Sequence, residues 1–290
     1  MEEMMGWHMP PDSDTELPLG DIPVSIVVTK ARSRVADGRG VGANSDRKYD
    51  LFRRALGRLI QVHFLSSRGR GLLVDMHAHD GGGVEKRQYD MFGENVAWSS
   101  SRRLIYWKKE ADRKGIPVDL VLCERNAERR AKLAEVAKTE GIEVTILKNN
   151  KHLVAWLMKQ EQAGVRYDWG VVTNDPCGPK DHGVEVLAEL GKVSRLDFVL
   201  IVNELAVKRL NGLQEKGHDI GKNAKLVASC RKAAHKYDWV MDCCEWARRV
   251  GRKRVLRSST LIKNRNHHGR CLVLTNHPTL TGTGFEAYTI

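Results

Sequence analysis

Residues 71–83 read Gly71-Leu72-Leu73-Val74-Asp75-Met76-His77-Ala78-His79-Asp80-Gly81-Gly82-Gly83, a short apolar run followed by a polar turn that ends in three glycines. The run predicts a buried strand that brings a carboxylate and a flexible loop to one edge of a sheet. Glycine allows close backbone approach and positive φ, which suits a loop around a cofactor. In open α/β sheets, ligands bind beyond the carboxyl ends of the strands. The alternative is an ordinary glycine-rich surface turn.

Strands and helices are expected to alternate on both sides of this stretch. Strands are expected at residues 117–124, 142–147, 167–173 and 197–202, and helices at residues 48–65, 99–114, 126–140, 151–162 and 182–190. After residue 203 the pattern becomes helical, and two strands are expected at 254–262 and 270–275. Alternation at this spacing indicates βαβ units and a parallel sheet.

The chain of 290 residues is predicted to begin with a flexible basic arm at residues 1–47, which includes a short strand at 23–29. One domain would follow at residues 48–290, with a helical insertion at residues 204–253. The acidic, proline-containing start is unlike a secretory signal. No apolar run approaches the roughly 20 residues of a membrane helix, so no membrane partner is expected.

The net charge of +12 and the pI near 9.5 favour a polyanionic partner, and nucleic acid, DNA or RNA, is the expected one. Basic residues cluster at 30–58, 248–257 and 263–270, although a generically basic protein is the alternative. The six cysteines lack the spacing of a disulfide framework, which favours reduced thiols and a cytoplasmic location. The oligomeric state is left open, and a homodimer is one of the states allowed.

Polar groups follow three of the expected strands. They are Asp75 with the glycines 81–83, then Glu124, and then Asp175-Pro176-Cys177. A carboxylate that ends the second strand of a nucleotide-binding sheet typically binds ribose hydroxyls, which assigns that role to Glu124. A solvated strand end is the alternative for a lone glutamate.

These motifs, in this order, resemble class I S-adenosylmethionine-dependent methyltransferases. The residues concerned are Asp75-x-His77-Ala78-x-x-Gly81, a Ser-rich helix start, Leu122-Cys123-Glu124-Arg125-Asn126 and Asn174-Asp175-Pro176-x-Gly178-Pro179. More narrowly, the order is similar to the three-Cys-motif partner proteins and the adenine-N6 ribosomal RNA methyltransferases. The C-terminal stretch 272–278 also resembles the former. The resemblance spans roughly residues 48–278 and consists of short motifs.

The resemblance implies an α/β fold with a Rossmann-like, doubly wound, mostly parallel sheet of the class I methyltransferase type. S-adenosylmethionine would be the cofactor. Asp75, His77, Ala78 and Gly81 would lie around its methionine part, Glu124 would hold the ribose, and Asn149 would border the adenine. Asp175 and Pro176 would face the methyl acceptor. No metal is expected in this reading.

The sequence departs from the family at two places. His79 stands where the family has its first glycine, and Cys177-Gly178 replaces the Pro-Tyr that follows Asp-Pro in exocyclic-amine methyltransferases. An amine acceptor would be oriented by Asp175 or by the backbone of Pro176, because methyl transfer needs an in-line approach. A carbon acceptor would instead need a thiolate, for which Pro176-Cys177 resembles cytosine-C5 methyltransferases. We predict transfer to a nucleic-acid base, with an exocyclic amine preferred.

Two other functions stay open. Asp-x-His77-x-His79 also resembles metal-dependent hydrolases, in which two imidazoles bind zinc, with Asp175 and His182 as further ligands. The chain could also be a non-catalytic nucleic-acid-binding protein on a degenerate methyltransferase fold, which the His79 departure favours. The basic stretch 263–270 is predicted to be a substrate-binding loop between two strands.

Overall fold

The computed structural model describes residues 43–66, 69–82, 98–176, 184–192, 195–203, 212–219, 221, 252–258, 262–264, 267–276 and 285–289. These residues all belong to one compact unit, which extends from Ser33 to Ile290. Within them, no helix is long and apolar enough to cross a membrane. The predicted strand at 23–29, most of the predicted arm and most of the predicted helical insertion lie outside the described residues.

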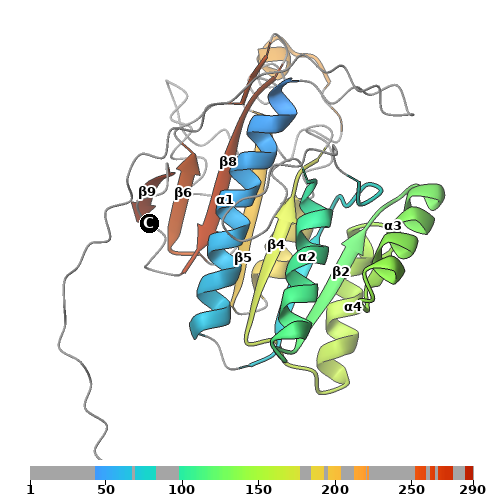
Figure 1. Ribbon diagram of the computed structural model, residues 1–290. Helices are drawn as coiled ribbons and strands as arrows, with labels where there is room; N and C mark the ends of the chain where they lie inside the picture. Colours follow the sequence, from blue (N-terminus) through green and yellow to red (C-terminus); the bar gives the residue numbers. More distant parts are fainter. Residues whose placement is uncertain are drawn as a thin grey trace, which may run out of the picture. The chain divides into compact units, whose positions relative to one another are not determined.

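The described elements alternate between helices and strands over the first two thirds of the chain (Figure 1). The helices are α1 (Ala43–Ser66), α2 (Ser100–Arg113), α3 (Ala127–Thr139), α4 (Lys151–Gln162) and α5 (Val184–Lys192). The first five strands are β1 (Gly71–Asp75), β2 (Val118–Cys123), β3 (Thr145–Leu147), β4 (Trp169–Asn174) and β5 (Leu196–Asn203). The last four are β6 (Arg254–Ser258), β7 (Ile262–Asn264), β8 (His267–Thr275) and β9 (Phe285–Thr289).

All nine described strands form one sheet, with the order β3-β2-β1-β4-β5-β8-β6-β9 and β7 paired to β8. β1 to β5 are parallel to one another. β8 is antiparallel to both β5 and β6, so β6 runs in the direction of the first five strands. The expected mostly parallel sheet is therefore confirmed, and an antiparallel segment extends it beyond β5.

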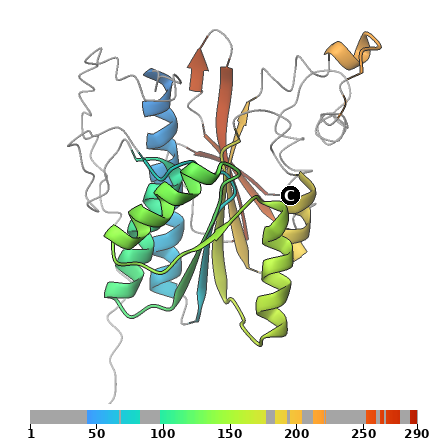
Figure 2. The ribbon, with the colours of Figure 1, turned by 90° about the vertical axis from the view of Figure 1, so that its right-hand side faces the viewer.

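Helices cover both faces of the sheet, as a doubly wound fold requires (Figure 2). Apolar residues of α1, α2 and α3 pack with one face of the strands in one core cluster. Apolar residues of α4 and α5 pack with the other face in a second cluster. The parallel strands are buried on both sides, which explains why β1 and β4 are almost continuously apolar in sequence.

The helix ends agree closely with the sequence signals. Ser99 caps α2 by accepting a hydrogen bond from the Arg102 N–H, and Asn126 caps α3 by accepting one from the Arg129 N–H. Gly141 follows α3 with a φ of +68°, the left-handed conformation that favours glycine after a helix. These two residues bound the helix predicted at residues 126–140, and the structure confirms that helix as α3.

Two boundary predictions were wrong, and one strand was not predicted. α1 begins at Ala43, so residues 43–47 are helical rather than part of the basic arm, since each residue added to a packed helix gains a hydrogen bond. The predicted loop at 263–270 is largely a hairpin, because β7 pairs with β8 through Asn264↔His267. β9 was not predicted, and it pairs with β6.

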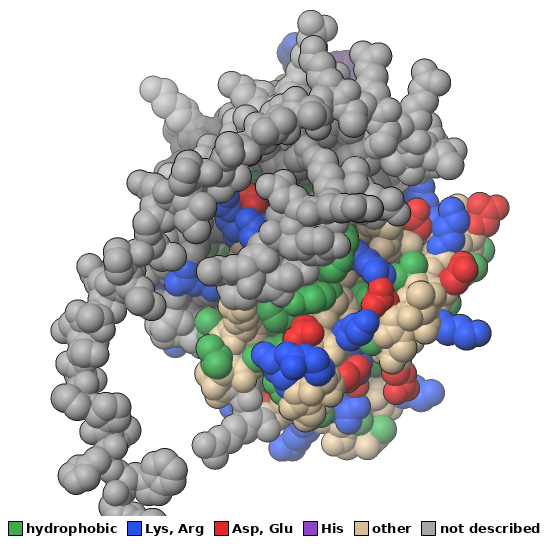
Figure 3. Space-filling model, viewed as in Figure 1, with side chains coloured by type: hydrophobic (Ala, Val, Ile, Leu, Met, Phe, Trp, Pro, Cys, Tyr) green, Lys and Arg blue, Asp and Glu red, His purple; other side chains and the backbone are tan. Residues whose placement is uncertain are grey.

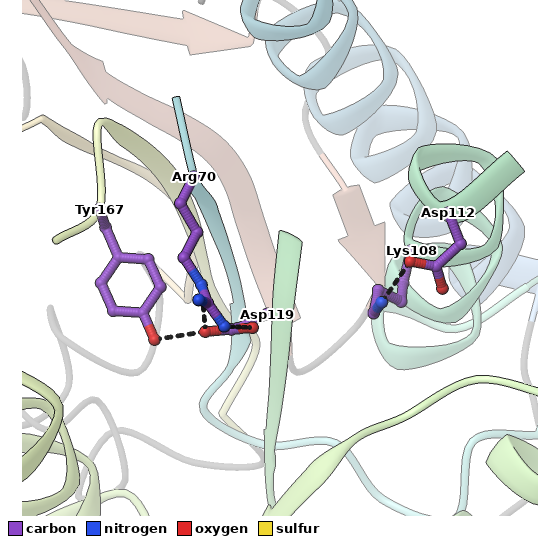
Figure 4. Close-up of polar contacts among 5 residues, drawn as sticks. All are labelled: Arg70, Lys108, Asp112, Asp119 and Tyr167. Atoms are coloured by element: carbon purple, nitrogen blue, oxygen red, sulfur yellow. Dashed lines mark hydrogen bonds and ion pairs between the residues drawn. The ribbon is translucent and has the colours of Figure 1, made fainter. Parts of the chain in front are cut away.

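The amino ends of the parallel strands are joined by a polar cluster (Figure 4). Arg70 donates from Nε and Nη2 to the two carboxylate oxygens of Asp119, over 3.0 and 2.8 Å, and the Tyr167 hydroxyl donates to Oδ2 of Asp119 over 2.6 Å. Burial, and then the hydrogen bond to Asp119, raise the pKa of Tyr167. The same view shows Lys108 paired with Asp112 along α2. These contacts stabilise the edge opposite to the strand-end carboxylates.

A buried histidine connects α1 to the middle of the sheet. His63 Nε2 lies 2.9 Å from Oδ2 of Asp197 at the start of β5, and its ring stacks on Trp169 of β4 with centroids 5.0 Å apart. His63 and Asp197 are both buried. Because a buried polar group needs a hydrogen-bond partner, this contact fixes the position of α1 along the strands.

Candidate functional site

The carboxylates that follow the parallel strands lie at one edge of the sheet, close to the point where the strand order reverses. Asp75, the last residue of β1, is paired in register with Leu122 of β2 on one side and with Thr173 of β4 on the other. α2 follows β1 on one face of the sheet and α5 follows β4 on the opposite face. The gap between β1 and β4 is thus the topological switch point, where open α/β sheets bind their ligands.

Asp75 is fully buried and both of its carboxylate oxygens have donors. The His77 N–H donates to Oδ1 over 3.0 Å, and the Ser100 hydroxyl donates to Oδ2 over 2.7 Å. Burial raises the pKa of Asp75, while these two hydrogen bonds and the imidazoles of His77 and His79 oppose the shift. In this arrangement Asp75 orients the loop after β1 and holds it to the start of α2.

The serines at the start of α2 complete this attachment. The Ser101 hydroxyl donates to the Ala78 carbonyl over 2.7 Å, and the Ala78 N–H donates to the Cys123 carbonyl over 2.9 Å. Ala78 is therefore buried and held between α2 and β2. Sequence reasoning identified these serines only as a Ser-rich helix start. The run of three consecutive serines was the available signal for their second role.

The loop after β1 has a positive φ at a histidine as well as at a glycine. His79 has a φ of +53° and Gly81 has a φ of +71°. A Cβ atom on Gly81 would lie 2.9 Å from Cδ2 of Leu133 on α3, so the loop also packs closely against that helix. A non-glycine residue at positive φ costs of order 1 kcal/mol and persists only where its surroundings fix it. His79 thus adopts the left-handed conformation that favours glycine.

Glu124 lies directly after β2 and is held by backbone contacts. Its N–H donates to the Leu147 carbonyl of β3 over 3.0 Å, and its Oε1 accepts a hydrogen bond from the Asn126 N–H over 2.7 Å. Glu124 is 8% exposed, and within the described part of the chain Oε2 has no hydrogen-bond partner. One carboxylate oxygen therefore remains available to a ligand hydroxyl.

Two arginines on α3 reach the same edge, and sequence reasoning missed both. Arg129 Nη1 lies 3.3 Å from Nδ1 of His79. Arg130 Nη1 donates to the carbonyl oxygens of Glu124 and Arg125, over 3.0 and 2.7 Å. Arginines in the first turn of a helix are usually solvated, so the sequence alone carried no signal for these contacts.

Asn149 and Asp175 complete the set of predicted residues that the structure describes. Asn149 Oδ1 accepts a hydrogen bond from the Lys151 N–H over 3.0 Å at the start of α4, next to the end of β2. Asp175 and Pro176 follow β4 and are half-buried. The Asp175 charge contributes, after burial, to a raised pKa of Cys271. Cys177 lies outside the described residues, so its predicted role stays untested.

The alternative of a metal-dependent hydrolase gains no support from the described residues at the carboxyl ends of the strands. Among the described residues, no group of three or more His, Cys, Asp or Glu side chains could hold a metal ion. His182 is outside the described ranges, and His79 points its Nδ1 toward an arginine. The positive charge of an arginine disfavours a metal cation at the imidazole beside it. A zinc site instead needs an imidazole nitrogen that is free to bind the metal.

Comparisons with known proteins found similarity only to solved structures. No protein-family model matches the sequence, and no curated protein matches it. A structure from Legionella pneumophila, of the DUF519 family, is 11% identical with a TM-score of 0.45, over 80% of this chain and 86% of that chain.

Two methyltransferase structures are similar at the same level. The plantazolicin methyltransferase BpumL with S-adenosylhomocysteine is 11% identical, TM-score 0.39, over 81% of this chain and 88% of that chain. The methyltransferase domain of bacterial CtHen1 is 10% identical, TM-score 0.38, over 78% and 99%. At such scores and identities these similarities assign no activity, and the fold is established by the strand order itself.

Proposed function

We propose that this protein is an S-adenosylmethionine-dependent methyltransferase that acts on an exocyclic amine of a nucleic-acid base. The observation that carries the proposal is the position of Glu124 at the strand edge. Its carboxylate keeps one oxygen without a partner among the described residues, next to a loop with positive φ at His79 and Gly81. A carboxylate after the second strand and a glycine-type loop after the first are the two features that a nucleoside cofactor requires.

The chemistry of these groups fits the cofactor. Glu124 Oε2 would accept a hydrogen bond from a ribose hydroxyl, and Asn149 would border the adenine at the end of β3. His77, Ala78 and Gly81 would surround the methionine part. The contact of Asp75 with His77 and the contact of Ser101 with Ala78 would hold the backbone of this loop in place. When bound, S-adenosylmethionine supplies a methyl group on a positively charged sulfur. No metal takes part in this proposal.

The acceptor would lie on the β4 side of the switch point, near Asp175 and Pro176. The amine nitrogen uses its lone pair to form the bond to the methyl carbon, while the carbon–sulfur bond breaks and its electron pair stays on sulfur. The Asp175 carboxylate accepts a hydrogen bond from the amine, which directs the lone pair, and takes up or relays the proton that the product releases. A Cys177 thiolate attacking a base carbon is the alternative route.

The nucleic-acid acceptor is supported by charge. The net charge of +12 over 290 residues favours a polyanionic substrate, since neutralised phosphates release counterions on binding. The base must reach the strand edge, which requires single-stranded substrate or an extruded base.

The test is a calorimetric titration of the purified protein with S-adenosylmethionine and S-adenosylhomocysteine. We expect one-to-one binding, followed by transfer of labelled methyl groups to an RNA or DNA pool. Folded protein that binds neither molecule would overturn the proposal. Nucleic-acid binding without cofactor binding would instead identify a non-catalytic protein on this fold, which the histidine at position 79 favours.

A further inference from the structure

The ends of β2 and β3 bring two basic segments together at one corner of the sheet. Cys123 and Leu147 are paired in register, and the Glu124 N–H continues the pairing to the Leu147 carbonyl. The turns that follow, residues 125–126 and 148–150, therefore begin at the same corner of the sheet. α3 then runs along one face of the sheet and α4 along the other (Figure 2).

We name the cations of these segments the β2–β3 rim: Arg125, Arg129, Arg130, Lys148 and Lys151. Arg125, Lys148 and Lys151 are exposed. Where the structure describes the chain, neither Lys148 nor Lys151 has a carboxylate within 4.0 Å. Carboxylates are few at the rim: Glu124 is buried and accepts the Asn126 N–H, while Glu128 is exposed at the start of α3. Counted over the described residues, the rim thus carries more positive than negative charge.

Several basic residues elsewhere on the described surface are paired with acids. Over α2 and α3, Lys and Arg side chains are interspersed with Asp and Glu (Figure 3). Arg102 and Lys109 both pair with Glu140, and Arg113 pairs with Glu110 at 2.8 Å. At the amino ends of the strands, Arg70 pairs with Asp119. Matched pairs cancel much of the field at a distance, so these cations contribute less to polyanion binding than Lys148 and Lys151 of the rim.

We propose that the β2–β3 rim binds the phosphodiester backbone of the nucleic-acid strand that carries the acceptor base. This deepens the proposed function and rests on it for the identity of the acceptor. Lysine is a compact charge suited to phosphate oxygens, and such contacts position a strand without selecting its sequence. The rim therefore supplies affinity, and the β4 side of the switch point selects the base.

The sheet sets the spacing between the rim and the acceptor site. β3 is separated from β4 by β2 and β1, which is three strand spacings, or roughly 14 Å. A stacked strand rises about 3.4 Å per nucleotide, so this distance corresponds to about four nucleotides. Phosphates about four nucleotides from the acceptor base would then contact Lys148 and Lys151.

The chain offers a matched pair of variants for the test. The rim variant is Lys148→Ala with Lys151→Ala, at the start of α4. The control variant is Lys138→Ala with Lys159→Ala, two exposed lysines in the last turns of α3 and α4, at the opposite edge of the sheet. Both variants remove the same charge from exposed positions, and thermal melting checks that each is folded.

The measurement is fluorescence anisotropy of labelled single-stranded RNA and DNA of mixed sequence over a series of salt concentrations. We expect the rim variant to bind about tenfold more weakly, with a salt slope lower by roughly 1.4, because each single-strand phosphate contact contributes about 0.7. The control variant should change affinity less than about twofold, since it loses only long-range charge.

Equal losses in the two variants, no loss in the rim variant, or no binding by the unmodified protein would overturn the rim proposal. Cofactor titration of the unmodified protein is a separate measurement. If the unmodified protein does not bind the cofactor while the rim variant alone loses affinity for nucleic acid, the proposal of methyl transfer is wrong and the rim assignment stands.

Discussion

Arg129 Nη1 lies 3.3 Å from Nδ1 of His79, and this contact joins the first turn of α3 to a loop residue with a φ of +53°. For the contact to be a hydrogen bond, Nδ1 must be the accepting nitrogen of a neutral imidazole. His79 is therefore attached to the helix that follows the proposed ribose site.

Substitutions of His79 separate the backbone effect from the side-chain contact. His79→Gly and His79→Ala both lose the contact with Arg129, but only glycine adopts positive φ without steric cost. We expect the glycine variant to be more stable than the alanine variant by about 1 kcal/mol. Urea unfolding of both variants measures this difference. Equal stabilities would mean that the left-handed conformation at position 79 carries no strain.

Gly81 and Gly141 share almost the same φ, +71° and +68°, but only Gly81 is crowded. A Cβ on Gly81 would lie 2.9 Å from Leu133 Cδ2, whereas nothing lies within 4 Å of a Cβ on Gly141. Gly141→Ala should cost about 1–2 kcal/mol, and Gly81→Ala should cost at least about 1 kcal/mol more. Denaturant unfolding of the two variants measures the difference, and equal costs would contradict the close packing of the loop on α3.

Asp75 makes stability depend on pH in a defined direction. Burial raises its pKa above the ordinary value of 3.8. An acid with a raised pKa in the folded state stabilises the fold below its ordinary pKa, and this contribution is lost as the pH rises through the raised value. Asp75→Asn does not titrate and keeps an oxygen for the His77 N–H, so its stability relative to the unmodified protein should increase with pH.

Unfolding free energies at a series of pH values test the Asp75 assignment. The quantity to compare is the difference in unfolding free energy between Asp75→Asn and the unmodified protein, because the other titrating groups are the same in both. A difference that stays constant between about pH 4 and pH 8 would show that the pKa of Asp75 is not raised.

The ribose assignment predicts a loss of cofactor affinity in Glu124→Gln. The variant keeps an oxygen for the Asn126 N–H but replaces the remaining carboxylate oxygen with an amide. A hydrogen bond to a charged group contributes about 1.5–3 kcal/mol, so the Kd for S-adenosylmethionine should rise roughly tenfold to a hundredfold. Glu128→Gln, an exposed carboxylate in the first turn of α3, is the control and should leave the Kd unchanged.

The acceptor assignment predicts that Asp175→Asn affects turnover more than cofactor binding. Loss of a positioned carboxylate at a proton-transfer site typically lowers the rate by about a hundredfold or more. Single-turnover transfer from labelled cofactor, with calorimetry on the same sample, measures both quantities. Full turnover in the variant would place the methyl acceptor elsewhere on the strand edge.

The sequence predicted local features well and distant contacts poorly. Gly71–Asp75, Asn126 and Gly141 carry strong local signals, namely an apolar run, a helix cap and a helix stop, and the structure confirms all three. The contact of Ser100 with Asp75 joins residues 25 positions apart and depends on how α2 meets β1, which no local pattern encodes.

The C-terminal strands show the same limit. Residues 263–270 are polar and basic, so they resembled a loop, but β7 and the start of β8 pair through backbone groups that do not depend on side-chain polarity. β9 is a short edge strand without a strong alternating pattern, and its pairing with β6 decides its structure.

The position of α1 constrains the order in which this protein folds during its synthesis. α1 contacts β4 and β5, and also β7 and β8, which are made about 200 residues after the end of α1. At 5–20 residues per second, roughly 10–40 s pass before the later strands leave the ribosome. During that interval α2, β4 and β5 are the partners present for the apolar face of α1, so the nascent chain should first form the centre of the sheet and add the antiparallel strands afterwards.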